Sequence, residues 1–303
     1  MRLPLVDIII PHLNDHDRLA LCLDSVKRQN YPADCITVTV VDNGSDQPLD
    51  AVLARFPGVR GMLETRRGCG SARNHGVAAS SGTILAFTDS DCRPEPDWLI
   101  KGVPLLGEGT GIDIVGGDVK VFAADETNPT DAELYDEVFG FECRRYVRFK
   151  HFACGANIIV PRRVFEAVGP FRDGRLPEDL EWGRRATRLG YRIAFGAEAR
   201  VRHPARTSFA ELNKKNERTV WHARNHMAEG RAFRLKWAAY TLAMASPPLI
   251  KTVMVLTSPA LKGSGQRWRV FKTLLRVRYG RAAAMARYLF APIPAANDSS
   301  TKE

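Results

Sequence analysis

The sequence predicts an α/β domain followed by a basic helical extension. Two β-branched apolar runs, at 6–10 and 36–41, have the composition of buried strands and enclose a helical period at 17–29. A second unit follows, with a helix at 71–79 and a strand at 83–88 that ends in acidic residues. The charge divides the chain as well, because the last 104 residues hold 20 Lys and Arg against only 5 Asp and Glu.

Composition and downstream patterning narrow the class of protein. Further elements are predicted as strands at 118–122, 158–160 and 191–195, and as helices at 131–148, 162–168 and 178–189. The 303 residues fit one catalytic domain with an appendage, and 45% hydrophobic with 26% charged residues excludes a disordered chain or a polytopic membrane protein. Six cysteines without a C-x-x-C pair predict reduced structural thiols. The N-terminal segment is too interrupted for a secretory signal, so a cytoplasmic location is expected.

Acidic residues follow the predicted strands where a ligand would bind. Asp89 and Asp91 come directly after the strand at 83–88, while Pro11 and Asp42 close the two earlier strands. Because ligands of open α/β sheets bind outside the carboxyl ends of the strands, these residues are expected to converge on one crevice. The carboxylates suit Mn²⁺ or Mg²⁺. An isolated Asp-x-Asp pair, however, is more often a solvated turn.

Two other motifs carry a functional and a structural interpretation each. Glu178 and Asp179 open the predicted helix at 178–189, where they serve either the helix dipole or general-base catalysis in an inverting transfer. The stretch 68–73 begins like a dinucleotide fingerprint, but Arg73 replaces its third glycine, so a dehydrogenase is disfavoured. Arg73 could bind a diphosphate or could be an ordinary surface residue.

Taken in order, these segments resemble the family 2 glycosyltransferases over about residues 5 to 210. The matching segments are Val-Asp-Ile-Ile-Ile-Pro-His-Leu-Asn at 6–14, Val-Val-Asp-Asn-Gly-Ser-Asp at 40–46, Gly-Ser-Ala-Arg-Asn-His-Gly at 70–76, Ala-Phe-Thr-Asp-Ser-Asp-Cys at 86–92, Gly-Ala-Asn at 155–157 and Pro-Glu-Asp-Leu-Glu-Trp-Gly-Arg-Arg at 177–185. Each segment alone is unspecific, but six such segments in the same order as in the family make the resemblance strong. The resemblance implies the GT-A fold, a nucleotide-binding domain with a mixed, mostly parallel sheet.

Carried over by position, the resemblance implies roles for the polar residues. It assigns the nucleotide pocket to Pro11, Asp42 and Asp89, metal binding to Asp91, and the catalytic base to Asp179. His203 follows a strand-like segment where some relatives place a metal or diphosphate ligand, the alternative being a plain surface histidine. Leu13 and Asn43 depart from the common pattern, so the resemblance does not identify the nucleotide. The Gln-x-x-Arg-Trp segment of processive synthases is absent, which predicts single transfers.

The C-terminal third predicts a membrane contact. The domains expected are a catalytic domain at 1–210, a basic amphipathic helical extension at 211–290 and a disordered tail at 291–303. The apolar stretch 237–250 is broken by Ser-Pro-Pro and is shorter than the ~20 residues of a spanning helix. An interfacial helix on an anionic leaflet is predicted instead from apolar residues at helical spacing among arginines, namely Trp268, Phe271, Leu274 and Leu275. Packing on the catalytic domain is the alternative, and no nucleic-acid-binding module accompanies the charge.

The resulting hypothesis is a metal-dependent, inverting glycosyltransferase. It would use a nucleotide-diphosphate sugar and Mn²⁺ or Mg²⁺, and would act on a saccharide or glycolipid acceptor in cell-envelope or exopolysaccharide synthesis. An enzyme held peripherally at the inner face of the cell membrane would meet such an acceptor. A nucleotidyltransferase is the rival enzyme, and an inactive, membrane-associated binding protein with the same fold is the rival from another class.

Overall fold

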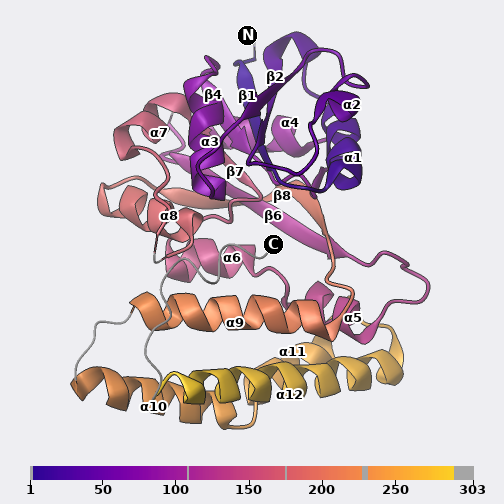
Figure 1. The fold of residues 1–303 in the computed structure, drawn as a ribbon, viewed down its shortest axis with the longest axis vertical. Helices are drawn as coiled ribbons and strands as arrows, with labels where there is room; N and C mark the ends of the chain where they lie inside the picture. Colours follow the sequence, from indigo (N-terminus) through magenta and orange to yellow (C-terminus); the bar gives the residue numbers. More distant parts are fainter. Residues whose placement is uncertain (1–2, 108, 175, 227–230, 290–303) are drawn as a thin grey trace. The chain divides into compact units, whose positions relative to one another are not determined.

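The computed structural model describes residues 3–107, 109–174, 176–226 and 231–289, and it divides into two compact units (Figure 1). The first unit comprises Met1–Lys120, Glu142–Asp173 and Pro177–His203 and contains the β-sheet. The second comprises Val121–Phe141, Gly174–Leu176 and Pro204–Glu303 and is built from helices. The tail predicted at 291–303 lies outside the described residues.

The sheet has eight strands in the order β3-β2-β1-β4-β7-β6-β8-β5. Their bounds are β1 (Val6–His12), β2 (Ile36–Asp42), β3 (Val59–Leu63), β4 (Ile84–Phe87), β5 (Arg93–Pro94), β6 (Ile114–Phe122), β7 (Ile158–Pro161) and β8 (Ile193–Pro204). The pairs β1–β2, β1–β4 and β2–β3 are parallel, whereas β4–β7, β6–β7 and β5–β8 are antiparallel. The mixed sheet is therefore confirmed.

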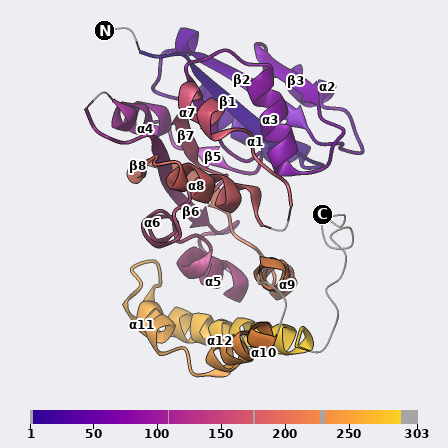
Figure 2. The same ribbon diagram turned by 90° about the vertical axis from the view of Figure 1, so that its left-hand side faces the viewer.

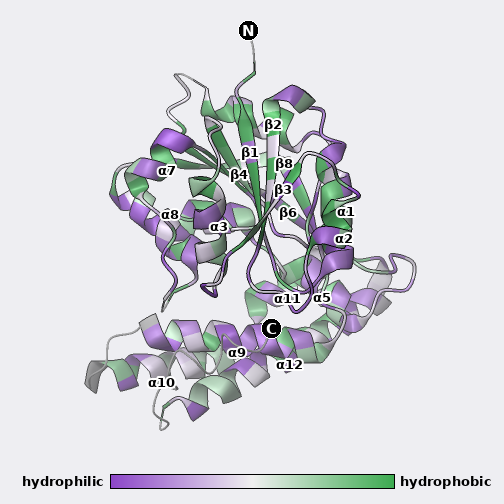
Figure 3. Cartoon of the chain, turned by 45° about the horizontal axis from the view of Figure 1, so that its top comes forward, coloured by the Kyte–Doolittle hydropathy of each residue, from purple (hydrophilic) through white to green (hydrophobic). Residues whose placement is uncertain are grey.

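The central strand β1 is buried along its whole length, as its continuous apolar run predicts. Figure 3 shows the same hydrophobic character along β1 and β4. One charged residue of β1, Asp7, is buried as well, and Arg162 pairs with it at 3.0 Å. The Thr37 hydroxyl and the Gly82 N–H also donate to Asp7, so this acid stabilises the N-terminal end of β1, away from the predicted site at its carboxyl end.

Helices cover both faces of the sheet. Those of the first unit are α1 (His16–Lys27), α2 (Asp50–Leu53), α3 (Cys69–Ala78), α4 (Trp98–Gly102), α6 (Cys143–Arg145), α7 (Arg162–Val168) and α8 (Glu178–Arg188), with 3-10 turns η1 (Ala33–Cys35) and η2 (Val103–Leu106) and a π-helical turn η3 (Tyr146–Lys150). A Cβ on Gly76 of α3 would meet Ile9, and one on Gly102 of α4 would meet Ile159. Glycine at these positions lets each helix approach its strand closely.

One part of the core lies between the sheet and the helices α3, α7 and α8. Its members include Ile9, Phe87, Ile158, Val160, Phe165, Phe171 and Trp182. Most predicted elements are present here, although β6 begins before and β8 runs well beyond the predicted ranges. The edge strand β3 was not predicted, since its side chains are largely exposed and lack a period-2 apolar pattern.

The second unit contains α5 (Asp131–Phe139), α9 (Phe209–His226), α10 (Arg231–Ala245), α11 (Leu249–Thr257) and α12 (Gly263–Arg287). A capping box between Thr130 and Glu133 begins α5. The range 131–148 is mostly helical as predicted, but it is not one helix: α5 ends before Gly140, where a Cβ would lie 2.4 Å from the Asp136 carbonyl oxygen. The chain then re-enters the first unit as α6 and η3.

The predicted interfacial face of α12 is also wrong. Leu274 is buried, and it packs in one apolar cluster with residues of α5, α9 and α11, while Phe271 is partly buried against that cluster. Trp268 remains 59% exposed. The helical spacing indicated an amphipathic helix correctly, but its apolar face is used to hold the second unit together.

Exposed apolar side chains gather instead on α10 and α11, at positions that we call the apolar elbow: Leu235, Leu242, Leu249, Ile250, Val253 and Leu256. In the described part of the chain, the stretch Phe233–Thr257 is long and apolar enough to cross a membrane by length and composition, and 11% of its most apolar window is buried. It is not one continuous helix, because Ser246-Pro247-Pro248 separate α10 from α11.

Candidate active site

The ends of β1 and β2 form the first part of the site. Pro11 pairs with Val41, and His12 with Asp42, so the carboxyl ends of the two strands stop together. The Asp42 carboxylate accepts hydrogen bonds from the backbone N–H and the hydroxyl of Ser45, at 3.0 and 2.6 Å. The structure therefore places Pro11 and Asp42 side by side, beside the strand β4 that leads to Asp89.

Two asparagines that the sequence analysis did not assign a role hold these loops. Asn14 adopts a left-handed φ of 59°, and its side-chain oxygen accepts a hydrogen bond from the Asp46 N–H. Asn43 donates to the carbonyls of Glu64 and Arg66 and accepts from the Gly68 N–H. Asparagine tolerates the left-handed region and bonds locally to backbone, which is the signal that such positions shape a turn.

Arg73 lies at the centre of the site, near the start of α3. Its side chain is 3% exposed, and its two terminal nitrogens donate to Asp89 at 2.7 Å and to Glu178 at 2.6 Å. Burial alone would lower the pKa of Arg73, but the two carboxylates outweigh it and raise the pKa above its usual value. Arg73 thus joins the strand that carries Asp89 to the helix that carries Glu178.

Asp179 occupies the second position of α8, next to Glu178. Its carboxylate accepts hydrogen bonds from the N–H of Gly155 at 2.9 Å and from its neighbour Leu180 at 2.7 Å. The residue as a whole keeps partial exposure, yet its carboxyl group is enclosed by protein. That enclosure, and secondarily the Glu178 charge, raises the pKa of Asp179 to about 7, against the lowering effects of Gly155 and Arg73. A carboxylate with this pKa can exchange protons near neutral pH.

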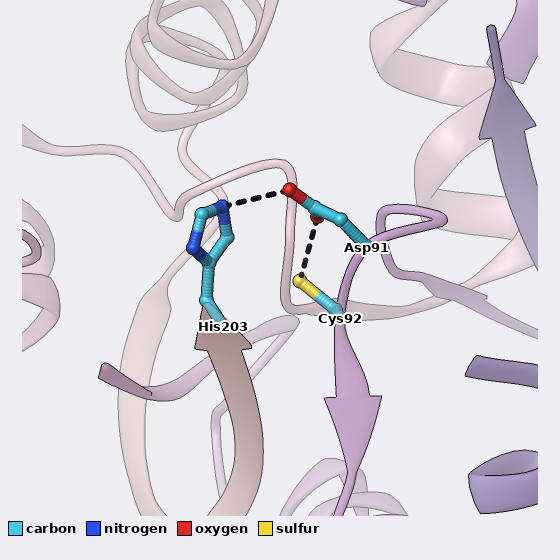
Figure 4. Close-up of side chains that lie close together, drawn as sticks. All are labelled: Asp91, Cys92 and His203. Carbon is cyan, nitrogen blue, oxygen red and sulfur yellow. Dashed lines mark hydrogen bonds and ion pairs between the residues drawn. The ribbon is translucent and has the colours of Figure 1, made fainter. Parts of the chain in front are cut away.

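Asp91, Cys92 and His203 form the group of residues within the described ranges that could hold a metal ion (Figure 4). The antiparallel pairing of Arg93 with Arg202 brings the loop before β5 alongside the end of β8. His203 Nε2 lies 3.3 Å from Asp91 Oδ2 as a result. The carboxylate and the imidazole fit Mn²⁺ or Mg²⁺, with coordination positions left for a substrate. Cys92 is fully buried, and burial raises the pKa of its thiol well above the usual value. Sulfur is also a soft ligand that suits Mn²⁺ and Mg²⁺ poorly, so Asp91 and His203 are the better candidates.

The histidine at the end of β1 is a further polar group that the sequence analysis missed. His12 is 2% exposed, and neither ring nitrogen has a hydrogen-bond partner among the residues that the structure describes. Burial and the neighbouring His16 lower its pKa to about 4, although Asp42 and Asp15 act in the opposite direction. The ring is therefore neutral at physiological pH.

Sequence comparison decides the family. The profile described as Glycosyl transferase family 2 matches residues 7–169, which is more than half of the chain. The chain belongs to glycosyltransferase family 2. It is therefore a glycosyltransferase with a nucleotide-sugar donor.

Individual relatives agree with this family. The glycosyltransferase AglE of Haloferax volcanii is 38% identical over 225 residues, which cover 71% of this chain and 72% of that protein. The probable glycosyltransferase YdaM of Bacillus subtilis is 28% identical over 247 residues, which cover 76% of this chain and 56% of that protein. Among solved structures, the mannosyltransferase PcManGT from Pyrobaculum calidifontis, in complex with GDP-Man and Mn²⁺, superposes with a TM-score of 0.59 at 21% identity, covering 91% of this chain and 86% of that one. This likeness confirms the GT-A fold.

The predicted site residues fall into two connected groups. Asp89 and Glu178, from distant parts of the sequence, meet at Arg73, while Asp91 meets His203. Glu178, which was grouped with Asp179 as catalytic, is held in an ion pair, whereas the hydrogen bonds that Asp179 accepts from described residues come from backbone N–H groups. Gly155 lies in the matching segment 155–157, but its role in orienting Asp179 could not be read from the sequence, because that contact depends on tertiary folding.

Proposed function

We propose that the chain transfers a sugar with inversion of the anomeric configuration, from a nucleotide-diphosphate donor to an acceptor hydroxyl, with Asp179 as the base. The observation that carries this proposal is the Arg73 bridge, which joins the donor-side acid Asp89 to the helix that bears Asp179. A transferase of this kind needs both groups at one site, because the acceptor attacks the carbon from which the nucleotide departs.

Each chain residue has a defined task in the proposed reaction. Pro11 and Asp42 line the nucleotide pocket. Asp89 binds the donor, and Arg73 holds the Asp89 carboxylate in place. The acceptor oxygen forms a bond to the anomeric carbon as the bond from that carbon to the diphosphate oxygen breaks. Asp179 accepts the proton that the acceptor hydroxyl loses, so the products are the glycoside, the nucleoside diphosphate and a protonated Asp179. A pKa of about 7 suits both taking up and releasing this proton.

Asp91 and His203 are proposed to hold the divalent cation, in support of which PcManGT was solved with Mn²⁺. Such an ion would neutralise charge that develops on the departing nucleoside diphosphate. We expect Asp91→Asn and His203→Ala each to lower the Mn²⁺-supported kcat/KM on the order of 100-fold, measured as a Mn²⁺ titration of transfer after chelation. Cys92→Ser is the matched control from the same cluster, and an equal loss in that variant would contradict the two-residue assignment.

A direct test of the reaction incubates the protein with a panel of nucleotide sugars and Mn²⁺, with and without membrane lipid. Release of nucleoside diphosphate identifies the donor, and proton NMR of the product shows whether an α-linked donor gives a β-linked product. Retention of configuration would contradict the inverting mechanism. No release with any donor would favour an inactive binding protein, while family membership disfavours the nucleotidyltransferase alternative.

We also propose that the second unit holds the enzyme on an anionic leaflet, at the cytoplasmic face of the membrane, where a glycolipid or lipid-linked saccharide acceptor would be available. Between Glu229 and Asp298 the sequence has no acidic residue, while α10, α11 and α12 carry arginines and lysines. The apolar elbow adds exposed side chains that can enter the acyl boundary. Because α10 and α11 have 15 and 9 residues, each is shorter than a spanning helix, and the proposed contact is monotopic.

Charge substitutions at the tip of the apolar elbow test this attachment. Leu249 and Ile250 are 75% and 81% exposed, so replacing both with glutamate should leave folding intact. We expect the double variant to lose binding to vesicles of mixed neutral and anionic phospholipid on the order of 100-fold, because two apolar side chains that would enter the membrane are replaced by charged ones. Co-sedimentation measures the loss, Leu63→Glu on the exposed face of β3 is the control, and unchanged binding would contradict the proposal.

A further inference from the structure

A basic surface lies beside the proposed base in the first unit, and neither the family match nor the site residues account for it. It consists of α6, the π-helical turn η3 and the exposed side of α8, and we call it the basic face: Arg144, Arg145, Arg148, Lys150, Arg184 and Arg188. All but Arg184 are exposed, and Arg184 is partly exposed. Figure 2, like Figure 1, shows α6 and α8 side by side.

Close contacts to the backbone hold η3 and the residues after it against α8, the helix that carries Asp179. Arg184 of α8 donates to the Lys150 carbonyl at 3.4 Å, and a Cβ on Gly183 would collide with Phe152. His151, with a left-handed φ of 58°, ends the π-helical turn, and the chain then continues to Gly155, whose N–H holds Asp179. π-helical turns are rare and occur often at functional sites. One short segment of backbone therefore carries much of the basic face and the glycine that orients the base.

Among the arginines of the basic face, one is paired with a carboxylate, and two have none within the described residues. Glu142 pairs with Arg145 at 3.2 Å, but neither Arg144 nor Arg148 has a carboxylate partner in the described part of the chain. Between the cations, Phe149 is 66% exposed, with the Arg148 guanidinium 5.3 Å from the centre of its ring. An exposed aromatic ring among arginines matches a ligand that has both an anionic group and an apolar part.

The stereochemistry of the proposed reaction indicates that the acceptor, and not the nucleotide, lies next to the basic face. The nucleotide occupies the ends of β1, β2 and β4, and in an inverting transfer the acceptor approaches from the face opposite the departing diphosphate. An acceptor hydroxyl bonded to Asp179 therefore has the rest of its molecule on the side of α8 and η3. We propose that the basic face binds a phosphate group of the acceptor, so that the acceptor is a phosphate-bearing lipid carrier. This assignment rests on the proposed function and names its acceptor class.

Binding of a simple amphiphile tests the assignment without requiring the correct acceptor sugar. Decyl diphosphate is the anionic lipid probe, decyl glucoside the uncharged one and inorganic pyrophosphate the anion without a lipid, all with the donor pocket saturated by nucleoside diphosphate and Mn²⁺. We expect the wild-type protein to bind decyl diphosphate about tenfold more tightly than either of the other probes, as charge-assisted contacts to phosphate predict. Equal binding of inorganic pyrophosphate would mean a site for free anions and would overturn the proposal.

Paired variants locate the binding. Arg144→Gln with Arg148→Gln should weaken decyl diphosphate binding about tenfold and leave decyl glucoside unaffected, while lysine at both positions should restore most of it. The matched control, Arg55→Gln with Arg163→Gln, removes the same charge from exposed positions elsewhere in the first unit. An equal effect in both pairs, or competition by anionic vesicles as strong as by the probe, would overturn the assignment to an acceptor. Donor cleavage is measured separately, so a failure of the proposed function is distinguishable from a failure here.

Discussion

Asp179→Asn should lower kcat by about 1,000-fold while leaving the KM for the donor nearly unchanged, because only the acceptor proton depends on this carboxylate. The Gly155 and Leu180 N–H groups donate to different oxygens of Asp179, so the single amide oxygen of asparagine keeps one of these two hydrogen bonds while the side chain keeps its size. Initial rates of nucleoside diphosphate release, with donor and acceptor varied separately, measure both constants. A variant that keeps wild-type kcat would exclude Asp179 as the base.

The pH dependence of the wild-type enzyme gives an independent test of the same residue. Asp179 must be unprotonated to accept a proton, so kcat/KM should fall tenfold per pH unit below an apparent pKa of about 7. Glu178 contributes to raising this pKa, so Glu178→Gln should move the acidic limb to lower pH while the enzyme stays active. An acidic limb that does not move in Glu178→Gln would contradict the assignment.

The raised pKa of Asp179 also predicts that ionisation of this carboxyl lowers the stability of the folded protein. A group with a folded pKa above its unfolded value stabilises the fold when protonated, and that contribution is lost as pH rises from about 4 to about 7. Asp179→Asn cannot ionise, so its melting temperature should exceed that of the wild type by a few degrees at pH 8 and match it near pH 4. Thermal unfolding of both proteins at the two pH values measures the difference. A wild type that melts at a higher temperature than Asp179→Asn at pH 8 would contradict the raised pKa.

The sequence was sufficient to predict the strands β1, β2 and β4 and the acids that follow them, because buried parallel strands are continuous apolar runs. It also placed Asp179 at the start of a helix. The sequence could not show that the two terminal nitrogens of Arg73 pair with Asp89 and Glu178, because ion pairs between distant segments leave no periodic pattern. The prediction that the apolar face of α12 contacts lipid was wrong for a related reason. Residue spacing identifies an amphipathic helix, but it does not show whether protein or lipid covers the apolar face.

Arg73→Lys should lower kcat about 100-fold, because one ammonium group cannot reproduce a bridge made by two guanidinium nitrogens. Asp89 and the start of α8 would then lose their common partner, and the base would no longer be held against the donor side. Arg73→Ala should also cost about 3–5 kcal/mol of unfolding free energy, since it leaves two carboxylates without the buried charge between them. Steady-state kinetics and denaturant unfolding measure the two effects.

A purely structural role for Arg73 is separable from this positioning role by a matched variant and by pH. Arg162 is another arginine that bridges segments of the first unit, bonding to Asp7 near the start of β1 and to backbone. Arg162→Lys should lose stability yet keep kcat. The Arg73 charge lowers the pKa of Asp179, so Arg73→Gln should move the acidic limb of residual activity above pH 7, while Arg73→Lys should leave it in place. If kcat falls equally in the Arg73 and Arg162 lysine variants, the loss is one of general stability and the bridge does not position the base.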